Sequence, residues 1–156
     1  MLKILTLEET LMDKYMNEAI KEAERGIKLR HGGPFGAVIV YKGKIISKAH
    51  NTVLSAKDPT CHAEILAIRK ASKKLNRFDL SDCEIYTTGK PCPMCKGAIK
   101  WAKIQKVYYG CDYADAKTIG FEEQEGNSKD YHEEKICTEE CKHLYNEYRK
   151  MKAKRY

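Results

Sequence analysis

The sequence predicts an α/β protein in which a mixed β-sheet is covered by helices on both faces. A helix-like stretch comes first, two strand-like stretches joined by a two-residue turn follow it, and helices and strands then alternate. The 156 residues are an ordinary size for one domain, and no internal repeat or linker divides them. No apolar run is long enough to span a membrane. We therefore expect residues 1–156 to form a single domain.

The first helix is expected to begin at a capping box, in which Thr6 and Glu9 bond to each other's backbone. Apolar residues then recur at helical spacing to about Leu29, with Lys and Glu between them. The run His31-Gly32-Gly33-Pro34 ends this helix. Its glycines would let the backbone pass close to a ligand, although a plain connecting loop explains them equally well.

The later elements follow from similar local patterns. Lys42-Gly43 separates two β-rich stretches, which predicts a hairpin. After Gly110 the pattern weakens, and residues 120–130 are polar and acidic. We expect strands over residues 35–41, 44–49, 83–88 and 105–110, and helices over residues 60–75, 92–102, 113–117 and 140–156.

Two short motifs supply a set of metal ligands. They read His-x-Glu and Pro-Cys-x-x-Cys, and each falls where a helix is expected to start. A catalytic zinc takes three protein ligands and keeps its fourth position for water, and His62, Cys92 and Cys95 would be those three. We expect His62 in the first turn of its helix, Cys92 as the N-cap of the next helix, and Pro93 as that helix's first residue. The positive end of the helix dipole would favour the cysteine thiolates.

Glu64 is left free for proton transfer. Zinc lowers the pKa of bound water toward neutrality, and Glu64 could accept that proton, pass it to a ring nitrogen of the substrate and later protonate the departing amine. The expected reaction is hydrolytic deamination, in which zinc-bound hydroxide attacks an amidine carbon. The alternative is a closed structural site with Cys61 or Cys83 as fourth ligand, which would give Glu64 no purpose.

The composition limits where the protein works. Seven cysteines and an N-terminus without a secretory apolar segment predict free thiols and metal ligands rather than disulfides. We expect a soluble, cytoplasmic protein. The net charge is +7, and residues 149–155 form a basic cluster that fits either a nucleic-acid surface or a solvated helix face. Cys137, Cys141 and His143 could form a second metal group, with free thiols as the simpler explanation.

Asn51 follows the second strand of the hairpin and carries both a donor and an acceptor, which suits it to reading the edge of a base. Loop asparagines are more often only turn formers.

The two metal motifs together are the signature of zinc-dependent nucleobase deaminases, and the chain resembles the cytidine deaminase superfamily. Within it, the chain is most similar to the bacterial guanine deaminases. The similarity continues through Asp115 and residues 120–121 to Tyr156, so it covers nearly the whole chain. The stretches that carry it are residues 32–40, 51, 58–60, 62–64, 68–71, 91–95, 97–99 and 101–102.

The resemblance implies a three-layer α/β/α cytidine-deaminase-like fold with a five-stranded mixed sheet. It also implies one zinc ion per subunit and conversion of guanine to xanthine and ammonia. The implied roles are zinc binding by His62, Cys92 and Cys95, proton transfer by Glu64 with help from Asp115, purine binding by Asn51, and pocket formation by Phe35, Trp101, Tyr156 and the backbone of Ala63.

Guanine deaminases of this type are homodimers that exchange their C-terminal segments. By resemblance, residues 111–156 would form a lid, and Tyr156 would close the partner's site. One position departs from the family pattern: most relatives have a glutamate directly before Pro-Cys-x-x-Cys, and this chain has Lys90. That change brings a positive charge near the zinc end of the strand.

Three other functions are consistent with parts of the sequence. A tRNA adenosine deaminase would use the basic C-terminus but needs an open site for a flipped-out base. A cytosine or other small-amine deaminase shares the same metal motif. A zinc-containing RNA-binding domain without catalysis would have no use for Glu64.

Overall fold

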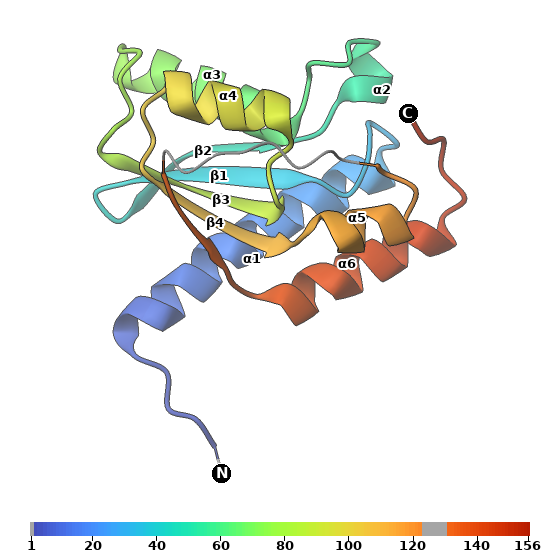
Figure 1. The fold of residues 1–156 in the computed structure, drawn as a ribbon, viewed down its shortest axis with the longest axis horizontal. Coiled ribbons are helices and arrows are strands. Elements are labelled where there is room, and N and C mark those ends of the chain that lie inside the picture. The colour runs from blue at the N-terminus through green and yellow to red at the C-terminus, as the bar shows by residue number, and fades with distance from the viewer. Residues whose placement is uncertain (1, 123–130) are drawn as a thin grey trace.

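The computed structural model describes residues 2–122 and 131–156. Its centre is a five-stranded sheet with the strand order β2-β1-β3-β4-β5 (Figure 1). Strand β1 runs antiparallel to both of its neighbours, whereas β3, β4 and β5 run parallel to one another. The predicted mixed sheet and α/β class are therefore confirmed. The strands are β1 (Gly36–Tyr41), β2 (Lys44–His50), β3 (Cys83–Gly89), β4 (Lys106–Cys111) and β5 (His132–Lys135).

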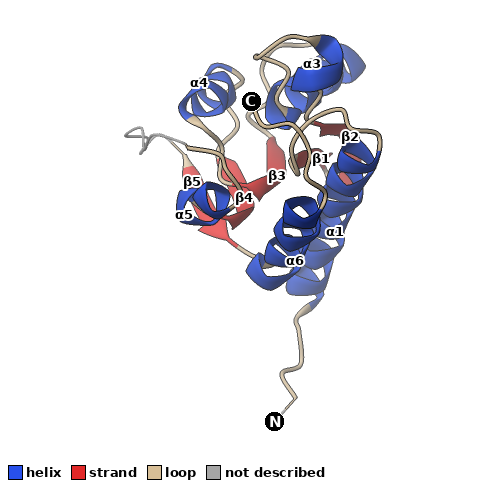
Figure 2. Cartoon of the chain, turned by 90° about the vertical axis from the view of Figure 1, so that its right-hand side faces the viewer, coloured by secondary structure: helices blue, strands red, loops and turns tan. Residues whose placement is uncertain are grey.

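Helices cover both faces of this sheet. α3 and α4 lie over one face, and α1 and α6 lie side by side on the other (Figures 1 and 2). Among the described residues, none of these helices has the length and apolarity needed to cross a bilayer. The helices are α1 (Leu7–Lys28), α2 (Val53–Ala56), α3 (Ala63–Leu75), α4 (Pro93–Trp101), α5 (Tyr113–Thr118) and α6 (Thr138–Lys150).

The alternation of side chains along the strands gives each face its own core. In β1, Ala37 and Ile39 are fully buried in the core beneath α3 and α4, while Val38 and Val40 belong to the core beneath α1 and α6. Successive strand residues point to opposite faces of a sheet, so an apolar run such as this one is expected where both faces are covered.

α1 begins as predicted and lies unusually close to the sheet. The capping box between Thr6 and Glu9 is present on both sides. Farther along, α1 crosses β1 so closely that a Cβ atom built on Gly36 would lie 2.0 Å from the carbonyl oxygen of Ala19. Gly36 therefore permits this contact, and the contact fixes the start of β1 next to Phe35.

The last part of the chain differs from the sequence prediction. The expected helix over 140–156 is wrong in its extent, because α6 begins at Thr138 and Met151 caps its end. Lys152 then takes a left-handed conformation with φ of 48°, which turns the chain out of the helix. The C-terminus returns toward the side of α3 and α4 (Figures 1 and 2). The chain end can therefore reach the ends of the strands.

The five strands that the resemblance implies are confirmed, but two elements were not placed along the sequence. α2 is a single turn of helix within the loop that follows β2. β5 has the sequence His-Glu-Glu-Lys, which shows no apolar alternation, and it joins the sheet only by pairing with β4. Of the segment expected to form a lid, β5 extends the sheet and α6 buries Leu144 and Tyr148 in the core.

Candidate active site

The predicted metal ligands come together where two helices begin. Cys92 is the N-cap of α4 and Pro93 is its first residue, as predicted. His62 directly precedes α3, so the prediction that it lies inside the first turn is wrong by one position. Because both helices start at this point, the positive ends of both dipoles face the same group of side chains.

The late start of α3 has a local cause. The carboxylate of Asp58 accepts hydrogen bonds from the backbone N–H of Thr60 at 2.8 Å and from its hydroxyl at 2.7 Å. This turn keeps the chain out of helical conformation until Ala63. The His62 side chain lies next to the sulfur atoms of Cys92 and Cys95 at the start of α4.

The three ligand atoms have the spacing that a zinc ion requires. Nδ1 of His62 lies 3.5 Å from Sγ of Cys92 and 3.6 Å from Sγ of Cys95. In a tetrahedral site with zinc–nitrogen and zinc–sulfur bonds of about 2.0 and 2.3 Å, nitrogen and sulfur are about 3.5 Å apart. The three residues therefore fit zinc. They would leave the fourth position open.

No other such group exists in the described part of the chain. Cys61 and Cys83 lie outside the group, which argues against a closed structural site. Cys137 and Cys141 lie outside it as well; the thiol of Cys137 instead donates to Oδ1 of Asp13 at 3.1 Å, and Cys141 is fully buried. These two cysteines are thus free thiols, as in the simpler explanation.

The two ligand thiols differ in acidity. The pKa of Cys92 is lowered, mainly because its sulfur accepts a hydrogen bond from Cys95, with a further contribution from His62. The pKa of Cys95 is raised, because it donates that bond and is buried. Zinc binds cysteine as the thiolate, so metal binding at these residues would release protons.

Glu64 is the second residue of α3 and is buried beside the ligands. Only 6% of its surface is exposed. Burial raises the pKa of its carboxyl group above the usual value, and the negative charge of Cys92 raises it further, while the charge of His62 acts in the opposite direction. A carboxyl group with a raised pKa holds a proton more readily than an ordinary one, which suits a group that shuttles protons. The role of Glu64 in proton transfer stays a prediction.

A pocket of about 30 Å³ opens onto these side chains. One wall is aromatic: the ring of Phe121 lies edge to face with Phe35 at 5.1 Å and with Tyr156 at 5.2 Å, measured between ring centres. The lining residues are Phe35, Asn51, His62, Glu64, Gly89, Lys90, Cys92, Phe121 and Tyr156.

Asn51 presents one defined donor to this pocket. Its side-chain oxygen accepts from the backbone N–H of Val53 at 3.0 Å, and only 1% of its surface is exposed. Because the partner is a donor, the contacting atom must be the oxygen. The amide NH₂ group is therefore left to bond an acceptor in the pocket.

The C-terminal residues are held over the pocket of their own chain. The hydroxyl of Tyr156 accepts from the backbone N–H of Gly33 at 3.1 Å. Next to it, Nε of Arg155 donates to the carbonyl of Ile119 at 2.9 Å, and the guanidinium lies 4.2 Å from the ring centre of Tyr148. Tyr156 thus lines the pocket of its own chain, whereas the resemblance implies that it closes the pocket of a partner, which stays a prediction.

The metal ligands, Glu64 and the surrounding fold agree with a sequence match. A model of the cytidine and deoxycytidylate deaminase zinc-binding region matches residues 9–111. The chain belongs to this deaminase family. It is therefore a member of a zinc-binding deaminase family, and His62, Cys92 and Cys95 form a group that could hold the zinc ion.

Relatives in the family act on different substrates. Guanine deaminase of Bacillus subtilis is 46% identical over 111 residues, which are 71% of each chain. The tRNA-specific adenosine deaminase of Aquifex aeolicus is also 46% identical, over 95 residues that span 61% of this chain and 62% of that protein. A solved structure of the Bacillus subtilis guanine deaminase superposes with a TM-score of 0.70 and 36% identity, covering 92% of this chain and 97% of that one.

Lys90, the departure from the family pattern, has a carboxylate close to its ammonium group. Its ammonium group lies 3.6 Å from Oε1 of Glu133 in β5 and 5.1 Å from the ring centre of Tyr113. The side chain is 14% exposed. The cation is therefore balanced by a carboxylate from the edge of the sheet, and it links the rim of the deaminase pocket to β5.

The structure does not bring every expected site residue to the pocket. Asp115 caps α5: its carboxylate accepts from the N–H of Asp112 at 3.0 Å, and it lies 3.9 Å from Nζ of Lys142. Ala63 is fully buried between the metal ligand and Glu64. Neither residue lines the pocket in this structure.

Trp101 lies away from the pocket. It is 86% exposed and borders a separate hollow with Ile68 and Phe78. The reason is its place in α4: nine residues of helix rise about 13 Å, so Trp101 lies at the opposite end from Cys92.

Phe121 forms part of the aromatic wall, although the sequence predicts no site role for it. Residues 120–121 belong to the stretches that carry the family resemblance. Gly120 has a φ of 97°, which favours glycine, and this turn directs Phe121 toward Phe35. A glycine followed by an aromatic residue after a short helix was the signal available.

Proposed function

We propose that this deaminase converts guanine and water to xanthine and ammonia. The supporting observation is Tyr156. The last residue of the chain reaches the metal pocket and closes it with Phe35 and Phe121. A site closed in this way suits a free base, whereas a base presented by a folded RNA needs an open approach.

The lining residues suit a flat purine. The rings of Phe35 and Phe121 offer apolar surface on one side, and the free NH₂ of Asn51 can donate to a ring nitrogen. The two rings suit the flat face of a heterocycle, and the amide of Asn51 suits a hydrogen-bond acceptor at its edge. We assign purine binding to Asn51 and Phe35 for this reason.

Glu64 performs the proton transfers in this proposal. Zinc held by the three ligands would lower the pKa of the attacking water. Glu64 takes a proton from that water and delivers it to the ring nitrogen beside the amidine carbon. Glu64 then takes the proton of the new hydroxyl group and passes it to the amino group, which leaves as ammonia while the carbon becomes a carbonyl. Asp115 is held in the capping box of α5 with the N-cap residue Asp112, so the help in proton transfer that the resemblance implies for Asp115 would require this box to open.

The second candidate is deamination of adenosine in tRNA. Two observations favour it. The Aquifex aeolicus relative has the same 46% identity as the guanine deaminase, although over a shorter stretch, and residues 149–155 form a basic cluster. However, Arg155 bonds to the backbone of Ile119 and covers Tyr148, so this part of the cluster anchors the chain end instead of facing solvent.

The exchanged homodimer stays a prediction. In the single chain, Tyr156 reaches its own pocket through the turn at Lys152. An exchange would need only this short connection to open, because α6 itself packs against the body of the fold. The same residue would then close the pocket of a partner.

Removal of Tyr156 tests the proposed function. Loss of one aromatic contact and one hydrogen bond is worth about 1–3 kcal/mol, so kcat/KM for guanine should fall about tenfold or more, with zinc content unchanged. Tyr156→Phe keeps the ring and should lose only a few-fold. If removal leaves guanine turnover intact, or creates turnover of an anticodon stem-loop in its place, the proposal is wrong.

A further inference from the structure

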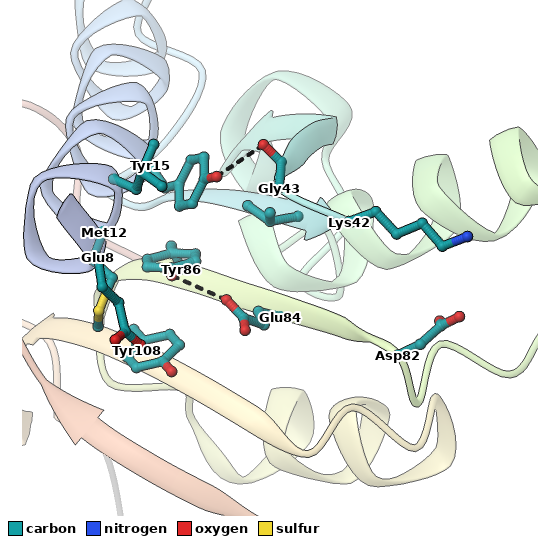
Figure 3. A pocket seen from close by; sticks show the side chains of 11 residues that line it. Glu8, Met12, Tyr15, Lys42, Gly43, Asp82, Glu84, Tyr86 and Tyr108 are labelled. Carbon is teal, nitrogen blue, oxygen red and sulfur yellow. Dashed lines mark hydrogen bonds between the residues drawn. The ribbon is translucent and has the colours of Figure 1, made fainter.

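A second hollow lies at the far end of the sheet from the metal. The metal pocket is at the start of β1 and the end of β3, whereas this hollow lies beside Val40 at the end of β1 and Glu84 at the start of β3. Its volume is about 380 Å³. The first turns of α1 and the turn between β1 and β2 complete its walls (Figure 3).

Three tyrosines from three elements form the inner wall of the hollow. The rings of Tyr86 and Tyr108 are stacked, with centres 4.7 Å apart and an angle of 20°, and Tyr15 tilts against Tyr86 at 5.3 Å. Each of the three is at most 7% exposed. They offer a rigid aromatic surface at the base of the hollow.

The polar atoms around these rings are mostly acceptors. The carbonyl of Gly43 accepts from the hydroxyl of Tyr15 at 2.9 Å, and Oε2 of Glu84 accepts from the hydroxyl of Tyr86 at 3.1 Å. Both acceptors keep a further lone pair. Glu8 contributes another carboxylate from α1. A ligand that satisfies this wall must bring hydrogen-bond donors.

Tyr108 brings a further hydroxyl group to the hollow. It lines the hollow and is 7% exposed, yet its hydroxyl makes no hydrogen bond within the described residues. Burial raises the pKa of this hydroxyl, with further contributions from Glu84, Glu134 and Glu8, so it keeps its proton. The hydroxyl is not among the buried side-chain atoms that lack a partner, so it is accessible from the hollow and could bond to a ligand there.

The charges at the rim leave the interior negative. Figure 3 shows the ammonium end of Lys42 pointing away from the three rings, and it lies 5.2 Å from the ring centre of Tyr41 instead. Asp82 is paired with Arg77 at 2.8 Å, and Lys106 lies 3.7 Å from the Oε1 atom of Glu84. Oε2 of Glu84 and the carboxylate of Glu8 are therefore open to a ligand, in a protein whose net charge is +7.

We propose that this hollow binds a small organic cation, an alkylguanidinium or alkylammonium ion. Its charged end would bond to Glu84 and Glu8, where charge-assisted hydrogen bonds are strongest. Its alkyl chain would lie on the tyrosine rings, which also attract cations. The site is separate from the deaminase pocket, so the cation would not compete with the substrate.

Binding of butylguanidinium to the full-length, zinc-loaded protein tests this inference. Butylurea has nearly the same shape without the charge and serves as the neutral control. Isothermal titration calorimetry gives both affinities, and NMR shifts of tyrosine ring signals report the location. Butylguanidinium should bind with saturation and shift the signals of Tyr86 and Tyr108, whereas butylurea should bind at least tenfold more weakly.

Three variants locate the contacts. Glu84→Gln should weaken butylguanidinium binding about tenfold, the effect of losing one charged partner, and Tyr108→Phe should weaken it a few-fold. Glu24→Gln removes an exposed carboxylate on another face of α1 and should change nothing. Absence of saturable binding, equal binding of butylurea, or equal losses from Glu84→Gln and Glu24→Gln would each overturn the proposal. Circular dichroism checks that each variant is folded.

Discussion

Replacing Gly36 by alanine tests the close contact between α1 and β1. The new Cβ atom would lie 2.0 Å from the carbonyl oxygen of Ala19 and 2.9 Å from the amide nitrogen of Ala23. Real Cβ atoms stay at least 3.0 Å from such neighbours, so the helix and the strand must separate by about 1 Å. Both neighbours are backbone atoms, and no side-chain rotation can relieve the contact.

The size of the effect follows from that separation. A gap of 0.5–1 Å loses about a quarter to a half of the dispersion energy of the contacts involved, and overpacking in a core costs about 1–3 kcal/mol. We expect Gly36→Ala to lower the free energy of unfolding by about 3 kcal/mol, a large part of the roughly 5–15 kcal/mol of a typical domain. Movement of β1 would also displace Phe35 from the pocket.

The matched control is Gly97→Ala. Nothing lies within 4 Å of a Cβ built on Gly97, which is inside α4. Alanine in a helix is favoured over glycine by about 0.5–1 kcal/mol, so this variant should be slightly more stable. Urea unfolding of both zinc-loaded variants at 25 °C should move the midpoint by about 1–2 M downward for Gly36→Ala and slightly upward for Gly97→Ala. Equal midpoints for wild type and Gly36→Ala would refute the reasoning.

Other parts of the structure give further expectations. Removing zinc with a chelator should abolish deamination and lower the melting temperature, and added zinc should restore both, because metal binding stabilises the folded state; a melting temperature that does not change would contradict the assignment of the ligands. Asp112 caps α5 with its pKa lowered to about 2, chiefly by the backbone hydrogen bond from Asp115. The stability that ionised Asp112 contributes is fully present above pH 3.8, the ordinary pKa of an aspartate, and is lost as the pH falls through about 2. Because 38% of the Asp112 side chain is exposed, solvent screening limits its contribution to the free energy of unfolding to about 1 kcal/mol. The stability of Asp112→Asn should therefore depend less on pH between 4 and 2 than that of the wild type. Identical pH dependence of the two proteins would contradict this role of Asp112.

The sequence predicted the elements whose patterns are local. The capping box at Thr6 and the hairpin turn at Lys42-Gly43 depend on neighbouring residues only, and both are present. The metal ligands were predictable because zinc demands a few residue types at defined spacing. The type and order of these elements then limited the fold to a mixed sheet between helices.

Features decided by distant contacts could not be predicted. β5 has no pattern of its own and exists through its pairing with β4. The end of α6 depends on the anchoring of Arg155 to Ile119, more than thirty residues away along the chain. The partner of Lys90 is Glu133 on β5, so the sequence showed the positive charge but gave no means of finding the carboxylate that balances it.

The most direct test of the account is ammonia release from the zinc-loaded protein, with guanine and an adenosine-containing anticodon stem-loop RNA assayed in parallel. Glu64→Gln is the blank: it should keep the zinc and the fold but lose about a hundredfold or more in rate, because general acid–base catalysis contributes that much. The account predicts ammonia and xanthine from guanine and none from the RNA. Release from the RNA alone, or equal rates with Glu64→Gln, would contradict it.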